Sequence, residues 1–390
     1  MFDSLMKVRK VNASLLKTQI MNHTLAHSLL LSGPPFSGKM SLAIEIARSL
    51  SCSKEGLERC DCPSCNSFRS MSMSNVIMLT DRDHEARIAA SLALFEQMQT
   101  EHSKRLLIGQ IRIALMAYHE AFVEKQDTKN SAIFALATDV DILLIDFEKS
   151  TIEESGILIT QLKKLLSPLL QAKRPSVSID NVRGSAKWTA NTGLIQQHRF
   201  IILENIENST VGANNSLLKL LEEPPLYTYV ILLSNHPKRL LPTILSRVQH
   251  HELKPLSKEE KQTLFQEVFY ADATHYSSIE EFVYSKGGVP LKELEKGAHS
   301  LIESLATRRV LETALLNPIL MTVDSSLSLR FFLDKLHYAL RDQLLQNKMS
   351  VREIEKIGAH INESVNKAKI YNQQTPVLLE TLYYRLVSMI

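Results

Sequence analysis

The segment HSLLLSGPPFSGKMSLAIEIARSL, residues 27–50, decides the fold that the sequence predicts. Its first six residues are apolar almost throughout, as in a β-strand that helices cover on both faces. Gly33, Gly38 and Lys39 then stand where a phosphate-binding loop has its glycines and its lysine, and a helical pattern follows. A strand, such a loop and a helix in this order predict an anion site, because the first amides of the helix attract phosphate.

The residue after Lys39 departs from this pattern. Phosphate-binding loops carry Ser or Thr there to bind Mg²⁺, and this chain has Met40. A thioether is a poor ligand for that hard cation. Ser41 points about 100° further round the helix and is no substitute. We therefore expect a degenerate loop that holds ATP only weakly or persists as a structural turn.

Three more apolar segments predict strands, at 75–80, 199–204 and 229–234. Helical patterns alternate with them, so the sequence predicts an α/β fold with a parallel sheet. The strand RFIILE ends at Glu204 and Asn205, where P-loop ATPases have an Asp for Mg²⁺ and often a Glu that activates water. An amide does not take a proton from water at neutral pH. The predicted ATP site therefore lacks a second catalytic group.

The composition is that of a globular protein. Of 390 residues, 44% are hydrophobic and 22% charged, and this length favours two or three domains. The net charge of +3 is too small to indicate a nucleic-acid partner by itself. No apolar run reaches the roughly 18 residues of a membrane helix, and the N-terminal residues lack the pattern of a signal peptide. We expect a cytoplasmic protein without membrane contact.

All four cysteines lie within 14 residues, at Cys52, Cys60, Cys62 and Cys65. In a reducing compartment this clustering favours a metal over disulfides, and four thiolates suit a closed structural Zn²⁺ site. The single residue between Cys60 and Cys62 is a tighter gap than usual, so one ligand is expected to be strained or replaced. The alternative is a loop with four unliganded thiols.

The rest of the chain reads as helical. Residues from about 83 to 174 predict a helical insertion that starts at a cap on Asp83. It is either a structural embellishment or an arm that binds a partner. A helical unit begins near residue 252 with a capping box at Ser257 and Glu260, and a second covers about 306–390.

The segment LLKLLEEPPLYTYVILLSNHPKRLLPTILSRVQ, residues 217–249, resembles the clamp-loader AAA+ subunits of bacterial DNA polymerase III. The loop segment, the four cysteines, SIDNVRGSAKW at 178–188 and NQQTPVLLETLYYRLV at 372–387 are similar to the same family. The resemblance implies an AAA+ P-loop sheet domain at 1–251, a small helical lid domain at 252–305 and a helical collar domain at 306–390.

The same resemblance implies a role for Arg247. It occupies the serine-arginine-cysteine motif of the family, with Val248 in place of the cysteine. In the family this arginine acts in trans, as an arginine finger on the nucleotide of a neighbouring motor subunit. The motor's own γ-phosphate-sensing arginine is missing from VPLKEL, residues 289–294. Loss of the groups that act in cis, with the trans arginine kept, is the pattern of the delta-prime branch.

The implied partners are the gamma/tau and delta subunits, the sliding clamp and primer–template DNA. The implied function is that of a stator, which completes the ring of a DNA polymerase holoenzyme at the nucleoid-associated replisome without fast ATP turnover of its own. Two alternatives stay open from the sequence. One is a gamma/tau-like motor with weak ATPase activity, and the other is a P-loop kinase of small molecules.

Overall fold

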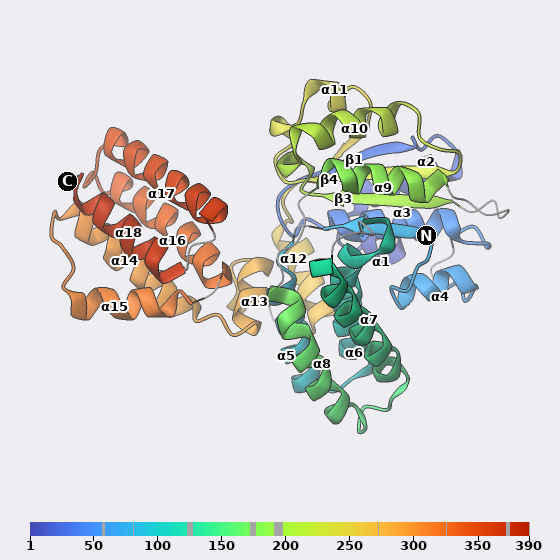
Figure 1. Ribbon diagram of the computed structural model, residues 1–390, viewed down its shortest axis with the longest axis horizontal. Coiled ribbons are helices and arrows are strands. Elements are labelled where there is room, and N and C mark those ends of the chain that lie inside the picture. Colours follow the sequence, from blue (N-terminus) through green and yellow to red (C-terminus); the bar gives the residue numbers. More distant parts are fainter. Residues whose placement is uncertain are drawn as a thin grey trace. The chain divides into compact units, whose positions relative to one another are not determined.

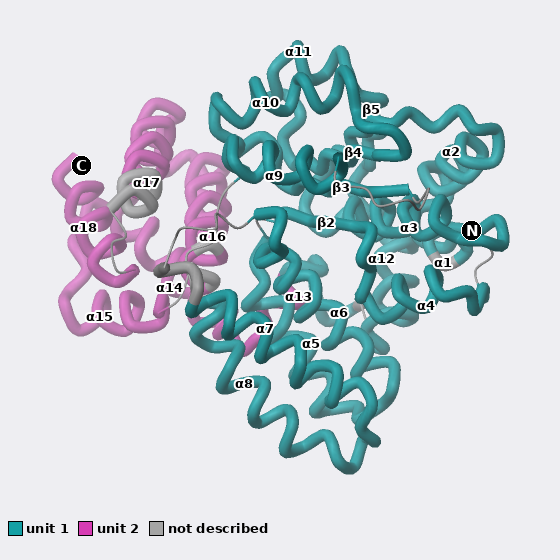
Figure 2. Tube along the Cα trace, turned by 45° about the vertical axis from the view of Figure 1, so that its right-hand side comes forward, with its two compact units in different colours: residues 1–280 teal, residues 281–390 magenta. Residues whose placement is uncertain are grey.

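The computed structural model describes residues 1–56, 59–80, 82–122, 128–171, 177–190, 198–271, 273–324, 326–371 and 375–389. These form two compact units, residues 1–280 and residues 281–390 (Figure 2). The domain boundaries expected at 251 and 305 stay predictions. Parts of three predicted segments lie outside the described residues: 57–58 of the cysteine segment, 123–127 and 172–174 of the insertion, and 372–374 of the collar segment.

Unit 1 is built on a parallel sheet of five strands among the described residues, in the order β2-β3-β4-β1-β5. The α/β fold class and the four predicted strands are confirmed. The strands are β1 (Ser28–Ser32), β2 (Val76–Leu79), β3 (Arg199–Glu204), β4 (Thr228–Ser234) and β5 (Gln249–Glu252). β5 was not predicted, because its sequence QHHE is polar. It pairs with β1 as the outermost strand on that side of the sheet.

Two apolar cores sandwich the sheet. One face packs on helices α2 (Lys10–Met21) and α3 (Lys39–Ser51). The other packs on α9 (Ile179–Ala190), α10 (Val211–Glu222) and α11 (Pro242–Leu245). Figure 1 shows α3 and α10 on opposite sides of the sheet. Side chains of β1, β2, β3 and β4 alternate between the two cores, which explains why these four strands read as continuous apolar runs.

The predicted insertion is helical and has its own core. Its helices pack side by side as a bundle: α5 (His84–Met98), α6 (Glu101–Leu115), α7 (Thr128–Lys149) and α8 (Ser155–Gln171). The expected cap at Asp83 is confirmed, since its side chain accepts a hydrogen bond from the amide of Ala86 at 3.4 Å. The bundle therefore begins directly at the carboxyl edge of the sheet, where β2 ends.

The remaining described helices are either short helices of unit 1 or the helices from residue 279 onward. The capping box at Ser257 and Glu260 is confirmed at the start of α12. The bounds are α1 (Asp3–Met6), α4 (Pro63–Arg69), α12 (Lys258–Leu264), α13 (Ile279–Lys286), α14 (Leu291–Ala306), α15 (Thr313–Thr322), α16 (Ser326–Leu345), α17 (Val351–Tyr371) and α18 (Thr375–Val387). Short 3₁₀ helices lie at Met116–Tyr118, Glu120–Phe122, Ile206–Asn208, Pro237–Arg239 and Ala273–His275, and a π-helix lies at Phe265–Phe269. Within the described ranges, no helix has both the length and the apolar character to cross a membrane.

Candidate functional site

The glycine-rich loop joins β1 to α3 at the carboxyl edge of the sheet. Gly33 and Gly38 both have positive φ, at 149° and 86°, so glycine is required at both positions. A Cβ atom on Gly33 would also collide with the carbonyl oxygen of Leu253. Gly38 is the N-cap of α3, which leaves the first amides of that helix facing the loop. Both glycines therefore serve the backbone path of the loop between β1 and α3.

Lys39 does not extend toward an open loop. Its Nζ atom lies 2.7 Å from the carbonyl oxygens of Gly33 and Pro34, and 2.9 Å from Oδ1 of Asn235. Ser37 Oγ is a fourth acceptor, at 3.3 Å. An ammonium has three N–H donors, so the protein itself offers acceptors for all of them. Burial lowers the pKa of Lys39 to about 8, although Glu204 and Glu207 oppose that shift.

Glu204 lies at the end of β3, and its carboxylate is paired with Arg82. Arg82 Nε is 2.8 Å from Oε2, and Arg82 Nη2 is 2.6 Å from Oε1. Both side chains are nearly buried, with exposures of 8% and 11%. Burial acts to raise the pKa of Glu204, but the charge and hydrogen bonds of Arg82 outweigh it and hold the pKa below its usual range. The carboxylate that would order Mg²⁺ therefore already has a cation.

Asn205 and Met40 also have partners within the protein. The side-chain oxygen of Asn205 accepts a hydrogen bond from Asn235 Nδ2 at 2.6 Å. Asn235, at the end of β4, thus links Asn205 to Lys39. Met40 is buried in the apolar core that includes α2 and α3, so its thioether serves packing.

Three residues near the loop and the end of β3 were not predicted from the sequence: Arg9, Arg82 and Asn235. The guanidinium of Arg9 is 4% exposed and donates to the carbonyl oxygens of Ser37 and Lys254, both at 2.8 Å. A second arginine, Arg87 from α5, lies over the ring of Phe36 in the loop, 4.2 Å from its centroid. An arginine directly after a strand was visible in the sequence at position 82, but its partner stands 122 residues later in the chain.

Arg247 lies between α11 and β5, apart from these contacts. Its side chain is 33% exposed. Nε is 2.6 Å from Oε1 of Glu222, the first glutamate of the LEEPP segment, and Nη1 donates to the carbonyl oxygen of Thr243 at 2.8 Å. The two ends of the LEEPP…SR block, 25 residues apart in sequence, are therefore joined by an ion pair that orients the guanidinium at the surface.

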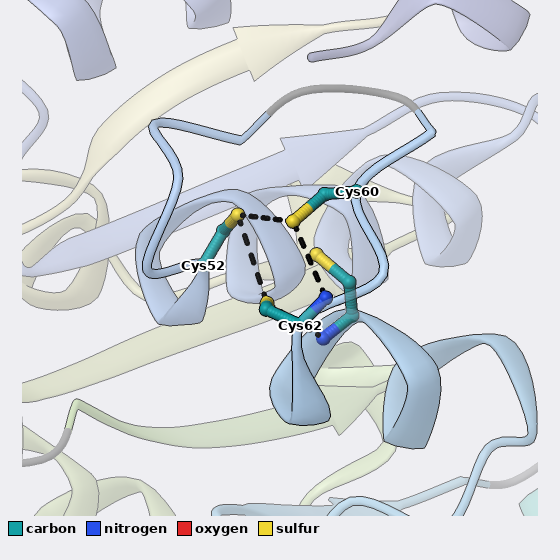
Figure 3. A group of neighbouring side chains, drawn as sticks. Cys52, Cys60 and Cys62 are labelled. Atoms are coloured by element: carbon teal, nitrogen blue, oxygen red, sulfur yellow. Dashed lines mark hydrogen bonds between the residues drawn. The ribbon is translucent and has the colours of Figure 1, made fainter.

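The four cysteines come together at the carboxyl end of α3. Their sulfur atoms all lie within 4.8 Å of one another, and Figure 3 shows the sulfurs of Cys52, Cys60 and Cys62 turned toward one another. Zinc–sulfur bonds of about 2.3 Å in a tetrahedron place the sulfur atoms about 3.8 Å apart. The Cys52–Cys60 and Cys52–Cys62 separations are 3.6 and 4.0 Å. The residues present can hold a tetrahedral metal ion, and the tight gap excludes neither Cys60 nor Cys62 from the cluster.

Backbone amides also face the sulfurs. The amide of Cys62 points to Cys60 Sγ at 3.5 Å, and that of Cys65 to Cys62 Sγ at 3.4 Å, where Cys62 caps α4. The backbone N–H of Lys54 donates a hydrogen bond to Cys52 Sγ at 3.3 Å. Such N–H···S contacts stabilise thiolates, which are the form that binds metal.

Comparisons with known proteins point to one family. The model of the family described as "DNA polymerase III, delta subunit" matches residues 9–133 and 141–257. Among curated proteins, DNA polymerase III subunit delta' of Pseudomonas aeruginosa is 40% identical over 77 residues, which cover 20% of this chain and 23% of that protein. The subunit delta' of Bacillus subtilis is 35% identical over 88 residues, 23% of this chain and 27% of that protein.

These alignments span about a quarter of the length of the curated relatives. A solved structure from Thermotoga maritima, described as a DNA polymerase III gamma subunit-related protein, is 19% identical and covers 65% of this chain and 98% of that chain. Its TM-score of 0.31 is too low for the two folds to be compared.

Proposed function

Because the chain belongs to the DNA polymerase III delta subunit family, whose model matches more than half of its residues, we propose that it is the delta-prime subunit of a bacterial clamp loader. In this role it completes a ring with gamma/tau and delta subunits. The ring loads the sliding clamp onto primer–template DNA. The chain acts as a stator, which supplies an arginine finger and turns over little ATP itself.

The observation that carries this proposal is that the groups of the predicted ATP site are already bonded to other groups of the protein. Lys39 is bonded to its own loop, and Glu204 is bonded to Arg82. Hydrolysis needs the lysine on the phosphates and the carboxylate near Mg²⁺. Removing one partner of a buried ion pair costs about 3–5 kcal/mol. Separating Arg82 from Glu204 so that a metal ion can bind has a free-energy cost of the same kind.

Water activation is a second obstacle to turnover. Asn205 holds the position of the base, and an amide has no useful basicity at neutral pH. Its oxygen is also bonded to Asn235. An ATP molecule that entered this site would therefore lack both a metal-ordering carboxylate and a base.

Arg247 is suited to act on a neighbour. It is partly exposed, and Glu222 and Thr243 hold its guanidinium in one orientation. An arginine finger of this kind contributes a factor of about 10³–10⁵ in the rate of phosphoryl transfer. A single well-placed arginine thus lets a subunit without its own turnover control the turnover of the ring.

We further propose that Cys52, Cys60, Cys62 and Cys65 hold a structural Zn²⁺ ion. When bound, the ion supplies a tetrahedral crosslink between the end of α3 and the start of α4. Four thiolates leave no open position for a substrate, so the site has no catalytic part in ATP turnover.

The test uses a clamp loader reconstituted with Arg247→Ala, and Arg183→Ala as the control, because Arg183 is another exposed arginine of unit 1. We expect the ring to assemble with both variants, and DNA-dependent ATPase and clamp loading to fall at least 100-fold only with Arg247→Ala. Unchanged loading would overturn the finger. ATP turnover by the isolated chain, abolished by Lys39→Ala, would instead support the gamma/tau-like motor.

A further inference from the structure

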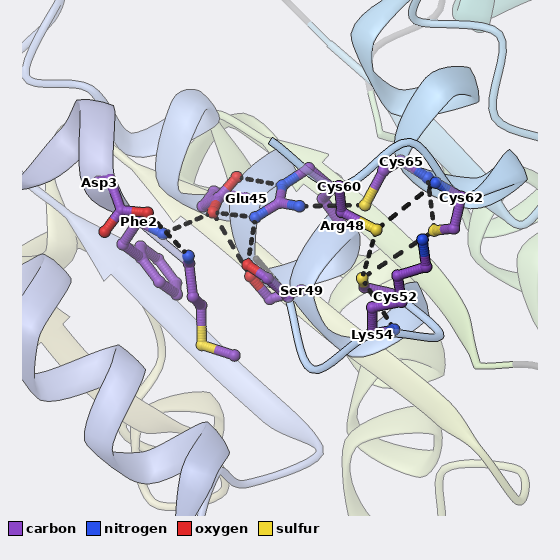
Figure 4. A network of polar contacts seen from close by, with 12 residues as sticks. Phe2, Asp3, Glu45, Arg48, Ser49, Cys52, Lys54, Cys60, Cys62 and Cys65 are labelled. Carbon is purple, nitrogen blue, oxygen red and sulfur yellow. Dashed lines mark hydrogen bonds and ion pairs between the residues drawn. The ribbon is translucent and has the colours of Figure 1, made fainter. Parts of the chain in front are cut away.

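One buried arginine connects the cysteine cluster to the first residues of the chain. Arg48 lies in the last turn of α3 and is 8% exposed. Its Nη1 atom donates to Cys65 Sγ at 3.1 Å, so it reaches the cluster directly (Figure 4). Its Nη2 atom donates to the carbonyl oxygen of Gly56 at 2.9 Å, in the loop between Cys52 and Cys60.

Glu45, one turn earlier on the same helix, holds Arg48 in place. Arg48 Nε is 2.7 Å from Glu45 Oε2, and Arg48 Nη2 is 2.7 Å from Glu45 Oε1. This two-pronged pair fixes both the position and the plane of the guanidinium. Since the contacts of the arginine with Cys65 and with Glu45 use different N–H groups, it binds both at once.

The carboxylate of Glu45 also binds the N-terminal segment. Its Oε1 atom accepts the backbone N–H of Phe2 at 2.7 Å, and the Phe2 side chain is buried in the core that includes α3. Met1 packs on the cysteine loop so closely that a Cβ on Gly56 would lie 2.7 Å from Met1 Cε. The first two residues therefore contact both α3 and the loop between Cys52 and Cys60.

We propose that Arg48 is a positioning residue of the metal site, and that metal binding at the four cysteines docks the N-terminal segment onto α3 through Arg48 and Glu45. This inference rests on the zinc site proposed above. Zinc with four thiolates carries a net charge of about −2, which a hydrogen-bonded guanidinium offsets. Without the ion, the loop around Gly56 loses its crosslink and Arg48 loses a charged acceptor. The contacts that Met1 and Phe2 make there weaken with it.

The first test measures zinc release in the full-length protein, by competition with a coloured chelator. The variants are Arg48→Met and Arg48→Lys. The control is Lys54→Met, which removes a positive charge from the same loop without removing a side-chain contact to sulfur, because the Lys54 side chain binds Asp61. Loss of a hydrogen-bond partner of a metal ligand typically costs 10–100-fold in metal affinity. We expect zinc to leave Arg48→Met about tenfold faster or more, with Lys54→Met near wild type and Arg48→Lys between them.

A folding defect is separated from a positioning role by the spectrum of the Co²⁺-substituted protein. Arg48→Met should keep the sulfur-to-cobalt absorption of a four-thiolate site while releasing the metal faster. Equal release rates in Arg48→Met and Lys54→Met would overturn the positioning role. Loss of the four-thiolate spectrum in Arg48→Met would overturn it as well, because the arginine would then be needed to form the site.

The second test follows amide hydrogen exchange in wild type with and without zinc. We expect zinc removal to increase exchange of a peptide covering Met1–Arg9 at least tenfold, while β1 and β4 keep their protection. Unchanged protection at the N-terminus would overturn the coupling and leave the zinc site standing. A protein that takes up no zinc would overturn both proposals, and neither result bears on the clamp-loading role of Arg247.

Discussion

Arg82 binds both carboxylate oxygens of Glu204, with Nε 2.8 Å from Oε2 and Nη2 2.6 Å from Oε1. Arg82 follows β2 and Glu204 is the last residue of β3, and the carboxyl ends of these neighbouring parallel strands meet at one edge of the sheet. An ATPase site needs the acid at the end of β3 to face a metal ion. Here the position beside the acid is taken by a guanidinium, whose positive charge already compensates the carboxylate.

Arg82 and Glu204 should stabilise the folded protein only when both are present. Arg82→Met leaves a buried carboxylate with less compensation, and we expect the free energy of unfolding to fall by about 3 kcal/mol in urea titrations. Adding Glu204→Gln to that variant should recover much of the loss, because the buried charge is then removed. Losses that simply add in the double variant would show that the two side chains do not act on each other.

The pH dependence of stability follows from the same carboxylate. The pKa of Glu204 is lower in the folded protein than its ordinary value of 4.5. A lowered pKa of an acid contributes stability that is fully present above the unfolded pKa and is lost as pH falls through the folded pKa. We therefore expect the urea midpoint of wild type to drop more steeply below pH 4.5 than that of Glu204→Gln. Parallel curves for the two proteins would contradict the ion pair.

The pKa of Lys39 can be used to test whether the loop binds a nucleotide. Burial lowers the pKa of its amine to about 8. In ¹⁵N-lysine NMR spectra we expect one side-chain signal to titrate near pH 8 in wild type and to be absent from Lys39→Met. ATP bound through this amine would raise its pKa, because polyphosphate favours the charged form. The contacts of Lys39 with its own loop and with Asn235 predict that millimolar ATP with Mg²⁺ leaves the titration unchanged. A clear upward shift would show that this amine leaves those partners to bind a nucleotide.

The sequence was sufficient for those features that are local. A continuous apolar run predicted each of the strands β1 to β4, and the positions of Gly33, Gly38 and Lys39 predicted the loop between β1 and α3. The spacing of the cysteines predicted a cluster that the structure brings within 4.8 Å. Each of these patterns is contained in a short segment, so propensity and spacing are enough to find it.

Contacts between distant segments could not be predicted in this way. Arg9 meets the loop 28 residues away at Ser37, and Arg82 meets Glu204 across 122 residues. A single arginine after a strand has no periodicity to mark its partner. The strand β5 was missed for a related reason. Its sequence QHHE has no apolar run, and it pairs with β1, which is far away in the chain.

The contact between Glu222 and Arg247 makes the last prediction. Nε of Arg247 lies 2.6 Å from Oε1 of Glu222, and both side chains are partly exposed. Exposed ion pairs stabilise a fold by only about 0–1 kcal/mol, so Glu222→Gln should barely change the unfolding midpoint. Orientation is the larger effect, since a finger must meet the γ-phosphate of its neighbour at one angle. We expect a ring with Glu222→Gln to lose about tenfold in ATPase, less than with Arg247→Ala, where the whole factor of about 10³ is removed. Glu223→Gln, the adjacent exposed glutamate, is the control. If both glutamine variants support the wild-type rate while Arg247→Ala does not, the finger acts without Glu222, and the LEEPP glutamate serves another contact.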